Sequence, residues 1–386
     1  MRIFISAGEA SGDLYASRVV EALRARHADA EFFGCAGPRM QAAGVRPIVD
    51  QRSLAVVGIV EVVAHLPRIW GEFRKLVRAA STANPDLAIL ADSPDFHLRL
   101  AKKLKRLGVP VVYLIAPQAW AWREGRVKTM RETIDRLLCI FPFEQEFFAS
   151  RGVPTAYLGH PLAKLARPSL SRAEFCRKAA LPEDSRMVAL LPGSRHGEVA
   201  RHLPMVIAAT KLIAARQNVR FVLALPPGFG FAGTKFSEPA RAASIQVLEG
   251  FTWDALAHAE LALAASGTVT MEAAVLGAPM VTFYRVNPLS WILGRWLVHA
   301  PHLTMVNLVA SRKIVPELIQ REMTAERIAV EALTLLENPR QREAMREDLA
   351  GVAAKLSTGH DPMETAVDWI EKVWSQHRHS GERAHA

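Results

Sequence analysis

Short apolar segments alternate with longer amphipathic segments along almost the whole chain, and this alternation limits the possible folds more than any other feature. Residues 2–6 and the fully apolar segment 87–91 are typical of strands, whereas residues 14–26 and 96–106 have helical spacing. Strands that alternate with helices pair in parallel through right-handed crossovers. We therefore predict an α/β protein built on doubly wound parallel sheets.

The alternation pauses once and then starts again, which predicts two domains. A polar stretch begins with Gly159–Leu162, and the next strand is expected at Met187–Leu191. A chain of 386 residues is long enough for two cores. We predict Rossmann-like domains over residues 1–165 and 166–350. Residues 351–386 form a C-terminal helix and tail, which either pack back on the first domain or are swapped in a dimer.

The charge and the cysteine content limit which binding partners and which cellular compartment are expected for the protein. The chain has 48 Lys and Arg against 38 Asp and Glu, a net charge of +10 and a pI of about 9.8, which favours an anionic partner. The basic residues are scattered among apolar ones and no nucleic-acid module is recognisable, so nucleic acid is not expected. Three separated cysteines, no signal peptide and no apolar run of spanning length favour a cytoplasmic protein that at most touches a membrane from outside.

Two loops in the first half follow predicted strands, where parallel sheets bind their ligands. Residues 6–13 (SAGEASGD) contain two glycines that permit close approach of a ligand to the backbone. A tight turn in which Ser11 or Asp13 caps the next helix is the alternative. Asp95 follows the strand at 87–91, where it either caps a helix or acts as a general base for an incoming hydroxyl.

Two loops in the second half have the same position and suit phosphate groups. In the turn that ends with Ser194 and Arg195, backbone N–H groups, a hydroxyl and a guanidinium are available for a diphosphate. Residues 266–268 (Ser266, Gly267 and Thr268) repeat this arrangement after another strand, and Glu272 is one turn further on, where it either accepts ribose hydroxyl groups or belongs to a helix cap. Plain strand-to-helix turns are the alternative for both loops.

Residues 54–78 combine a long apolar run with several basic and aromatic residues. This composition is typical of a segment that turns an apolar side toward acyl chains and a basic side toward anionic headgroups. Ordinary helix packing with a solvated basic edge is the alternative. The candidate acyl or membrane contacts are Val57, Ile59, Val60, Ile69, Trp70 and Phe73.

Taken together, the segments resemble the lipid-A-disaccharide synthase family from Ile5 to about Gln320. Single pieces such as PGSR are weak indicators, but the set is specific in this order and spacing. The motifs that carry the resemblance are SAGEASGD (6–13), GIVEVV (58–63), DSPDF (92–96), QAWAWR (118–123), GHPL (159–162), LLPGSR (190–195), ASGTVTMEA (265–273), YRVNPLSW (284–291) and NLVASRKIVPELIQ (307–320).

The resemblance implies a GT-B fold, with two Rossmann-like domains facing a central cleft, and an inverting glycosyltransferase. Its substrates would be UDP-2,3-diacylglucosamine and 2,3-diacylglucosamine 1-phosphate, joined into the β-1,6 lipid A disaccharide 1-phosphate with release of UDP. Another UDP-sugar enzyme of this fold, a UDP-GlcNAc 2-epimerase or a lipid-linked GlcNAc transferase, is the alternative. No cofactor or metal is expected.

The resemblance also assigns roles to residues of this chain. Asp95 would be the catalytic base. The nucleotide and diphosphate contacts would be Arg195, Ser194, Ser266, Gly267, Thr268 and Glu272, and the sugar-orienting or donor contacts would be Asn307, Gln320, Glu9 and Ser11. The protein would bind peripherally to the anionic cytoplasmic face of the inner membrane, and the choice between monomer and homodimer stays open.

Overall fold

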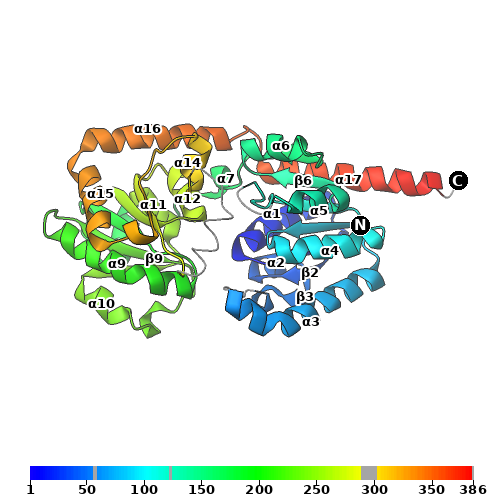
Figure 1. Ribbon diagram of the computed structural model, residues 1–386, viewed down its shortest axis with the longest axis horizontal. Helices are drawn as coiled ribbons and strands as arrows, with labels where there is room; N and C mark the ends of the chain where they lie inside the picture. The colour runs from blue at the N-terminus through cyan, green and yellow to red at the C-terminus, as the bar shows by residue number, and fades with distance from the viewer. Residues whose placement is uncertain (55–58, 121–123, 288–301, 385–386) are drawn as a thin grey trace. The chain divides into compact units, whose positions relative to one another are not determined.

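The computed structural model describes most of the chain, in the ranges 1–54, 59–120, 124–287 and 302–384. The chain divides into two compact units, which are coloured along the sequence in Figure 1. The N-terminal unit comprises Met1–Pro161 and Leu356–Ala386, and the C-terminal unit comprises Leu162–Lys355. The last helix of the chain therefore belongs to the same unit as the first strand.

A twisted parallel sheet forms the centre of the N-terminal unit. Its described strands are β1 (Arg2–Ala7), β2 (Glu31–Ala36), β3 (Arg46–Asp50), β4 (Leu87–Ala91), β5 (Val111–Leu114), β6 (Arg136–Cys139) and β7 (Thr155–Tyr157). They lie in the order β3-β2-β1-β4-β5-β6-β7, and every described pair is parallel. The chain order reverses between β1 and β4, and ligands of doubly wound sheets bind at the carboxyl ends of strands at such a point.

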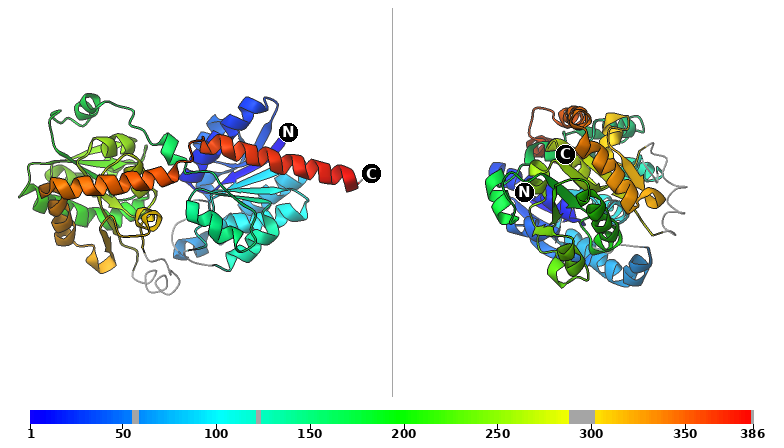
Figure 2. Two further views of the ribbon diagram at one scale, coloured as in Figure 1. Left: turned by 90° about the horizontal axis from the view of Figure 1, so that it is seen from above. Right: turned by 90° about the vertical axis from the view of Figure 1, so that its left-hand side faces the viewer.

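Helices of the N-terminal unit form two packed groups around this sheet. They are α1 (Ala10–Arg26), α2 (Pro38–Ala42), the short 3₁₀ helix η1 (Gln51–Ser53), α3 (Ile59–Ala83), α4 (Pro94–Arg106), α5 (Arg126–Thr133), α6 (Pro142–Ala149) and α17 (Pro362–Ala384). Helix α1 packs against α2 and α17, whereas α4 packs against α3 and α5. In the left view of Figure 2, α17, drawn in red, can be followed to the C-terminus.

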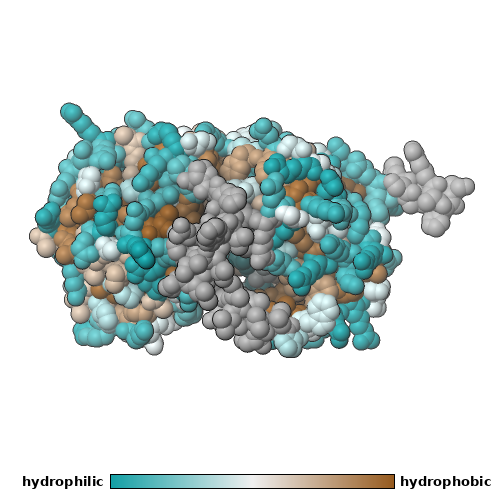
Figure 3. Space-filling model, viewed as in Figure 1, coloured by the Kyte–Doolittle hydropathy of each residue, from teal (hydrophilic) through white to brown (hydrophobic). Residues whose placement is uncertain are grey.

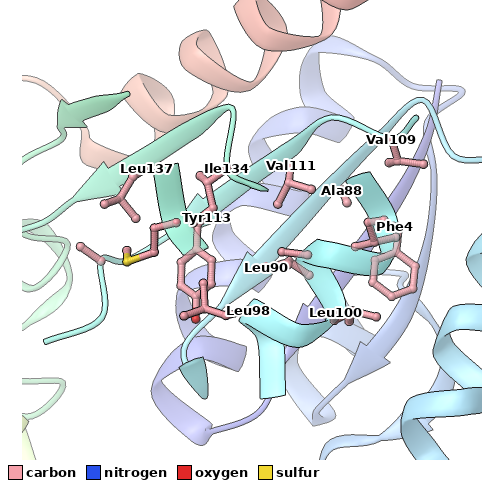
Figure 4. Packing of buried hydrophobic residues seen from close by; sticks show 14 of the residues in the cluster. Phe4, Ala88, Leu90, Leu98, Leu100, Val109, Val111, Tyr113, Ile134 and Leu137 are labelled. Atoms are coloured by element: carbon pink, nitrogen blue, oxygen red, sulfur yellow. The ribbon is translucent and has the colours of Figure 1, made fainter. Parts of the chain in front are cut away.

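The core of the N-terminal unit lies where neighbouring strands meet α4. Phe4, Leu90 and Tyr113, on β1, β4 and β5, are buried together with Leu98 and Leu100 of α4. Figure 4 shows these side chains gathered between the strands and the helix. Because both faces of a parallel sheet are covered, its strands are apolar throughout, as the LAILA sequence of β4 illustrates.

The C-terminal unit repeats this architecture. Its described strands are β8 (Met187–Leu191), β9 (Arg220–Leu225), β10 (Ile245–Glu249), β11 (Leu261–Ala265), β12 (Met280–Tyr284) and β13 (Glu317–Ile319). They are parallel and lie in the order β10-β9-β8-β11-β12-β13. The chain order therefore reverses between β8 and β11, which marks a second ligand-binding edge.

Helices also surround the second sheet. They are α7 (Leu162–Leu165), α8 (Arg172–Lys178), α9 (His196–Ala214), α10 (Ser237–Ala242), α11 (Thr252–His258), α12 (Thr268–Val275), α14 (Met305–Ala310), α15 (Ala325–Glu337) and α16 (Pro339–Leu356), with the 3₁₀ turns η2 (Phe231–Gly233) and η3 (Gln320–Glu322). Helix α9 packs against α15, and α12 packs against α7, α11 and α14. Helices α9 and α12 begin at the ligand-binding edge of the sheet, so their N-termini contribute to the candidate site.

Ion pairs hold the returning helix α17 on the N-terminal unit. The guanidinium of Arg26, at the end of α1, contacts the carboxylates of Glu364, Asp368 and Glu371 at 2.6–3.0 Å. His27 contacts Glu371 as well, at 2.7 Å. The hydrogen bonds that Arg26 donates to Asp368 and to Glu364 raise the pKa of its guanidinium. The guanidinium therefore fixes one face of α17 along the end of α1.

The predicted parallel α/β architecture is confirmed, and several strands lie at their expected positions. The strands predicted at 87–91 and 187–191 match β4 and β8 residue for residue. Strands β2, β3, β7, β10 and β13 were not predicted. Most of them lie at or next to sheet edges and are less continuously buried than β4, so their hydrophobic signal is weaker.

Within the described ranges, no helix combines the length and the apolarity that crossing a membrane requires. On the face seen in Figure 3, hydrophilic residues surround smaller apolar areas. Among the exposed large apolar side chains of the described residues, that of Trp70 on α3 is the largest, and it is 48% exposed.

The contact between β1 and β2 generates a testable prediction. Gly34 of β2 has φ +151°, and a Cβ atom there would overlap the carbonyl oxygen of Ile5. Gly34→Ala should therefore force the strands apart and lower the free energy of unfolding by at least about 2 kcal/mol, measured by urea denaturation.

Gly351→Ala is the matched control for that substitution. Gly351 is exposed within α16, and no heavy atom lies within 4 Å of a Cβ built there. Alanine at this position should be neutral or stabilising by up to about 1 kcal/mol. Equal stability of the two variants would contradict the close approach of the strands at Gly34.

Candidate active site

The first site candidate is the carboxyl edge of the N-terminal sheet, where β1 and β4 lie side by side. The loop after β1 contains Gly8 and Glu9, and the turn after β4 contains Asp92 and Ser93, both with positive φ values of 54° and 38°. Pro94 then starts α4, because its fixed φ and missing N–H suit the first helical position. The two motifs that the sequence placed after separate strands therefore meet.

The carboxylate of Asp92 joins the two loops. It accepts hydrogen bonds from the backbone N–H groups of Gly8 at 2.8 Å and Glu9 at 3.0 Å. A Cβ atom on Gly12 would overlap the Asp92 carboxylate, and one on Gly8 would overlap the Ser93 hydroxyl. The two glycines of SAGEASGD are therefore required by the close packing of the β4–α4 turn.

Burial and charge make Asp92 an unusual carboxyl group. Its side chain is only 13% exposed, and burial, followed by the charge of nearby Glu9, raises its pKa to about 7. Its main-chain oxygen accepts hydrogen bonds from the Tyr113 hydroxyl and from His97 Nδ1, the latter at 2.9 Å. Burial lowers the pKa of His97 to about 4, so the ring is neutral and its Nε2 accepts from Ser6 Oγ at 2.7 Å. These contacts fix the strained turn in one conformation.

Asp95, the predicted base, lies in a different environment. It occupies the first turn of α4, its side chain is 65% exposed, and one carboxylate oxygen lies 2.7 Å from Arg126 Nη2. Arg126 begins α5 and is itself 10% exposed. The sequence analysis missed Asp92 as a candidate, although its position directly after a buried strand was a usable signal.

Glu9 and Ser11 lie in the same loop region. Glu9 is exposed at the start of α1, and Ser11 is half-buried two residues later, in the first turn. Neither side chain caps α1 in the structure, and Asp13 instead accepts hydrogen bonds from the backbone of Arg39 and Met40, at the start of α2. The carboxylate of Glu9 is close enough to Asp92 for its charge to raise the pKa of Asp92.

The second site candidate is the carboxyl edge of the C-terminal sheet, between β8 and β11. Ser194 and Arg195 are exposed in the turn after β8, directly before α9. Ser266, Gly267 and Thr268 follow β11 and lead into α12, with Gly267 and Thr268 exposed. Because β8 and β11 are paired neighbours, the two turns start side by side, and the N-termini of α9 and α12 both favour an anion there.

Glu272 lies on α12, one turn beyond this edge. It accepts a hydrogen bond from Trp253, which favours its charged form, but burial outweighs this and raises its pKa to about 7. The carboxyl group therefore accepts hydrogen bonds in an environment of low polarity, where such bonds are strong. This fits the predicted contact with ribose hydroxyl groups and does not identify the ligand.

Asn307 does not fit its predicted role as a direct sugar contact. Its side chain is completely buried. Its Oδ1 accepts from the backbone of Ile314 and Val315 at 2.8 and 3.0 Å, and its Nδ2 donates to Val315 O and to Glu317 Oε1. The amide therefore holds the loop that leads into β13, through contacts seven to ten residues along the chain.

Gln320 is also occupied by contacts within the protein. It has φ +52°, its carbonyl oxygen accepts from the guanidinium of Arg285, and its side-chain Oε1 accepts from Val286 N at 3.2 Å. His202 links the same region to the turn after β8: its Nδ1 donates to Pro192 O at 2.7 Å, and its Nε2 accepts from Arg285 N at 3.1 Å. These contacts tie the ends of β8, β12 and β13 together.

The predicted acyl segment is only partly described. Val57 lies outside the described residues, and the side chains of Ile59 and Val60 are also outside them. Trp70 is exposed, stacks on Phe73 with ring centroids 5.2 Å apart, and lies under the guanidinium of Arg74. Ile69 is half-buried.

The structure corrects the prediction that Phe73 contacts acyl chains or a membrane. It is only 6% exposed and belongs to the hydrophobic core of the N-terminal unit, where it also contacts Phe96 edge-on. Helical periodicity turns this position toward the sheet, because Phe73 and Leu76 share the buried face of α3. Phe73 therefore supports Trp70 and does not contact a membrane directly.

No candidate metal site accompanies these groups. In the part of the chain that the structure describes, no three His, Cys, Asp or Glu side chains form a group suited to a metal ion. Charged groups at the two sheet edges include the carboxylates of Asp92 and Glu9 in one unit, and the guanidinium of Arg195 with the carboxylate of Glu198 in the other.

Two doubly wound parallel sheets, each with polar loops at its reversal point, define the GT-B class of glycosyltransferases and sugar epimerases. The structure resembles the UDP-GlcNAc 2-epimerase of Neisseria meningitidis, with a TM-score of 0.64 at 12% identity over 96% of this chain and 100% of that one. It equally resembles the glycotransferase of kitacinnamycin, with a TM-score of 0.64 at 17% identity over 96% and 98% of the two chains.

Sequence comparison then identifies the family within that class. The profile of the lipid-A-disaccharide synthetase family matches residues 3–364. A lipid-A-disaccharide synthase of Solibacter usitatus (strain Ellin6076) is 60% identical over 92% of this chain and 93% of its own length. The chain belongs to the lipid-A-disaccharide synthetase family, as its motifs predicted.

Proposed function

We propose that the chain is an inverting hexosyltransferase of lipid A, and hence lipopolysaccharide, biosynthesis. It transfers 2,3-diacylglucosamine from its UDP-activated form to the 6-hydroxyl of 2,3-diacylglucosamine 1-phosphate, which gives the β-1,6-linked disaccharide 1-phosphate and UDP. The observation that carries this proposal is family membership over residues 3–364, together with 60% identity to a lipid-A-disaccharide synthase.

The proposed reaction is a single displacement. A carboxylate removes the proton of the acceptor 6-hydroxyl, and the oxygen attacks the anomeric carbon from the face opposite to UDP. The bond to the diphosphate breaks as the new bond forms, so an α-linked donor gives a β-linked product. The reaction requires a base for the acceptor hydroxyl and positive groups for the leaving diphosphate, acting on one pair of oriented substrates.

The leaving diphosphate is stabilised by positive groups of the C-terminal unit. Arg195 binds its oxygens, and the N-terminus of α9 adds the partial positive charge of the helix dipole. Ser194, Ser266, Gly267 and Thr268 contribute hydroxyl and backbone donors, and Glu272 accepts from the ribose. No divalent metal ion and no cofactor take part in the proposed mechanism.

The base is a carboxylate of the β4–α4 turn, and its environment favours Asp92 over Asp95. A general base works best when its pKa lies near the working pH, and the pKa of Asp92 is raised to about 7. Its two oxygens accept from the backbone N–H groups of Gly8 and Glu9, and the Ser93 side chain donates a further hydrogen bond to the carboxylate. Asp95 is exposed and pairs with Arg126, which suits a role at the rim of the site.

The proposal includes peripheral binding to the anionic cytoplasmic face of the inner membrane, where both substrates are anchored by their acyl chains. Exposed basic residues line α3 around the exposed Trp70 ring. An amphipathic aromatic ring beside several cations suits the boundary between headgroups and acyl chains. The cations are Arg68, Arg74, Lys75 and Arg78.

The proposed reaction predicts UDP release that depends on both substrates. Purified protein should convert UDP-2,3-diacylglucosamine and 2,3-diacylglucosamine 1-phosphate of defined acyl chains into the disaccharide 1-phosphate, identified by mass spectrometry, and EDTA should leave the rate nearly unchanged. UDP release from the donor in the absence of acceptor would instead support an epimerase. A rate abolished by EDTA and restored by magnesium would contradict the metal-free account.

The assignment of the base predicts a pH profile. Asp92 acts as a base only when ionised, so kcat/KM should rise as the pH increases through about 7. Asp92→Asn should lower kcat by about 10²–10⁴-fold and remove this rise, with UDP affinity retained in calorimetry. Asp95→Asn is the control and should retain the profile. Loss of turnover in Asp95→Asn, with activity kept in Asp92→Asn, would return the base role to Asp95.

The membrane proposal predicts that Trp70→Ser weakens co-sedimentation with phosphatidylglycerol vesicles several-fold, because an apolar ring is lost from the lipid boundary. Binding of the wild type should fall further in high salt and with phosphatidylcholine alone. Leu212→Ser removes an apolar side chain of similar exposure, 41%, from α9 and should bind like the wild type. Equal losses in both variants would refute a specific role for Trp70.

A further inference from the structure

A carboxylate of the protein occupies the turn proposed to bind the donor diphosphate. Glu198, in the first turn of α9, accepts a hydrogen bond from the backbone N–H of Ser194 through Oε2 at 3.1 Å. Its other oxygen lies 3.5 Å from Arg195 Nη1. The two groups best suited to a phosphate oxygen in this turn, a backbone N–H and a guanidinium, therefore already face an internal anion.

Packing shows that this position of Glu198 is built into the turn. The side chain of Glu198 is 16% exposed, whereas that of Arg195 is 44% exposed, so the carboxylate lies beneath the guanidinium and against the backbone. Gly193 has φ +134°, and a Cβ atom there would lie 2.7 Å from Glu198 Cβ and 2.8 Å from Oε2. The glycine of the PGSR motif thus leaves the space that the carboxylate fills.

A carboxylate and a diphosphate compete for the same donors. The N-terminus of α9 and Arg195 stabilise one anion, and a second anion at the same place is repelled by the first. A backbone N–H carries a single hydrogen, so Ser194 N–H serves either Glu198 or a phosphate oxygen well. Binding of the nucleotide must then displace Glu198 or accept its repulsion.

We infer that Glu198 sets the affinity of the enzyme for its nucleotide by competing with the diphosphate for Ser194 N–H and Arg195. The inference rests on the proposed function, in which this turn holds the diphosphate of the donor. Glu198 weakens the binding of UDP and, once the sugar has been transferred, speeds its release. Glu198 is thus an affinity-determining residue and takes no part in the bond changes.

A purely structural role for Glu198 predicts the opposite sign. If the carboxylate only ordered the turn and aimed Arg195, its loss would loosen the phosphate contacts and weaken UDP binding. Competition predicts that the same substitution strengthens binding. The direction of the change therefore separates the two roles.

Calorimetric titration of UDP into purified variants tests the inference. Glu198→Gln keeps the size of the side chain and removes its charge, and Glu198→Ala removes the competing group entirely. Both should bind UDP about tenfold more tightly than the wild type, with the alanine variant at least as tight as the glutamine variant. In the transferase assay, UDP should also become a correspondingly stronger product inhibitor.

Two controls isolate the effect of the diphosphate. Glu238→Gln removes one negative charge from α10 in the same unit, where Glu238 is exposed and paired with Arg241, and should leave UDP affinity unchanged. Uridine, which has no phosphate, should bind the wild type and the Glu198 variants equally. Thermal melting verifies that each variant is folded.

The outcomes separate this inference from the function on which it rests. Tighter UDP binding in both Glu198 variants supports it, whereas unchanged or weaker binding in folded variants overturns it while leaving the transferase proposal intact. For example, the inference alone would fail if the wild type transferred the sugar normally while Glu198→Ala bound UDP more weakly. A wild-type protein that binds no UDP at all would overturn both.

Discussion

The N-terminal site depends on one buried contact, the Asp92 carboxylate bound to the backbone of the loop after β1. Two hydrogen bonds from the backbone of Gly8 and Glu9 stabilise the ionised Asp92 carboxylate, which burial disfavours. The balance leaves its pKa near 7, and so gives a proton acceptor suited to neutral pH. The contact exists only because Gly8 and Gly12 have no Cβ atoms to fill the same space.

The C-terminal unit has a similar sheet edge, but the groups gathered there are mainly hydrogen-bond donors and positive charge. Its sheet also reverses between two central strands, and two helices begin there with their positive ends at the edge. Glycine again leaves room for a carboxylate, because Gly193 lies against Glu198. Here the acidic group lies among donors that suit a ligand anion, so the same type of contact that creates a base in one unit moderates anion binding in the other.

Much of the fold and part of the site could be predicted from the sequence. Strands such as β4 and β11 are continuous apolar runs because both sheet faces are covered, and this signal is local. Residues just after such strands, including Arg195 and Ser266, lie at the edge where parallel sheets bind ligands. The motif resemblance then identified the family, and the comparisons confirmed it.

Other assignments depend on burial and on contacts that only the folded chain makes. Phe73 has the composition of a membrane contact but packs into the core, and Asn307 has the chemistry of a sugar ligand but holds the backbone before β13. The sequence analysis chose Asp95, whose carboxylate is exposed, whereas Asp92 acquires its character from a loop more than eighty residues earlier. A side chain's pKa and accessibility are set by its neighbours in space.

The sequence alone was therefore sufficient to predict the alternating α/β pattern, the family and the candidate loops. Periodicity, turns and motifs are properties of short segments, so they can be recognised without the tertiary structure. The choice between the two aspartates, the burial of Asn307 and the occupation of the Arg195 turn by Glu198 arose only on folding. The pKa of Asp92 depends on desolvation and on a loop more than eighty residues earlier, whereas Asn307 and Glu198 make contacts within ten residues of the chain that only the folded backbone brings together.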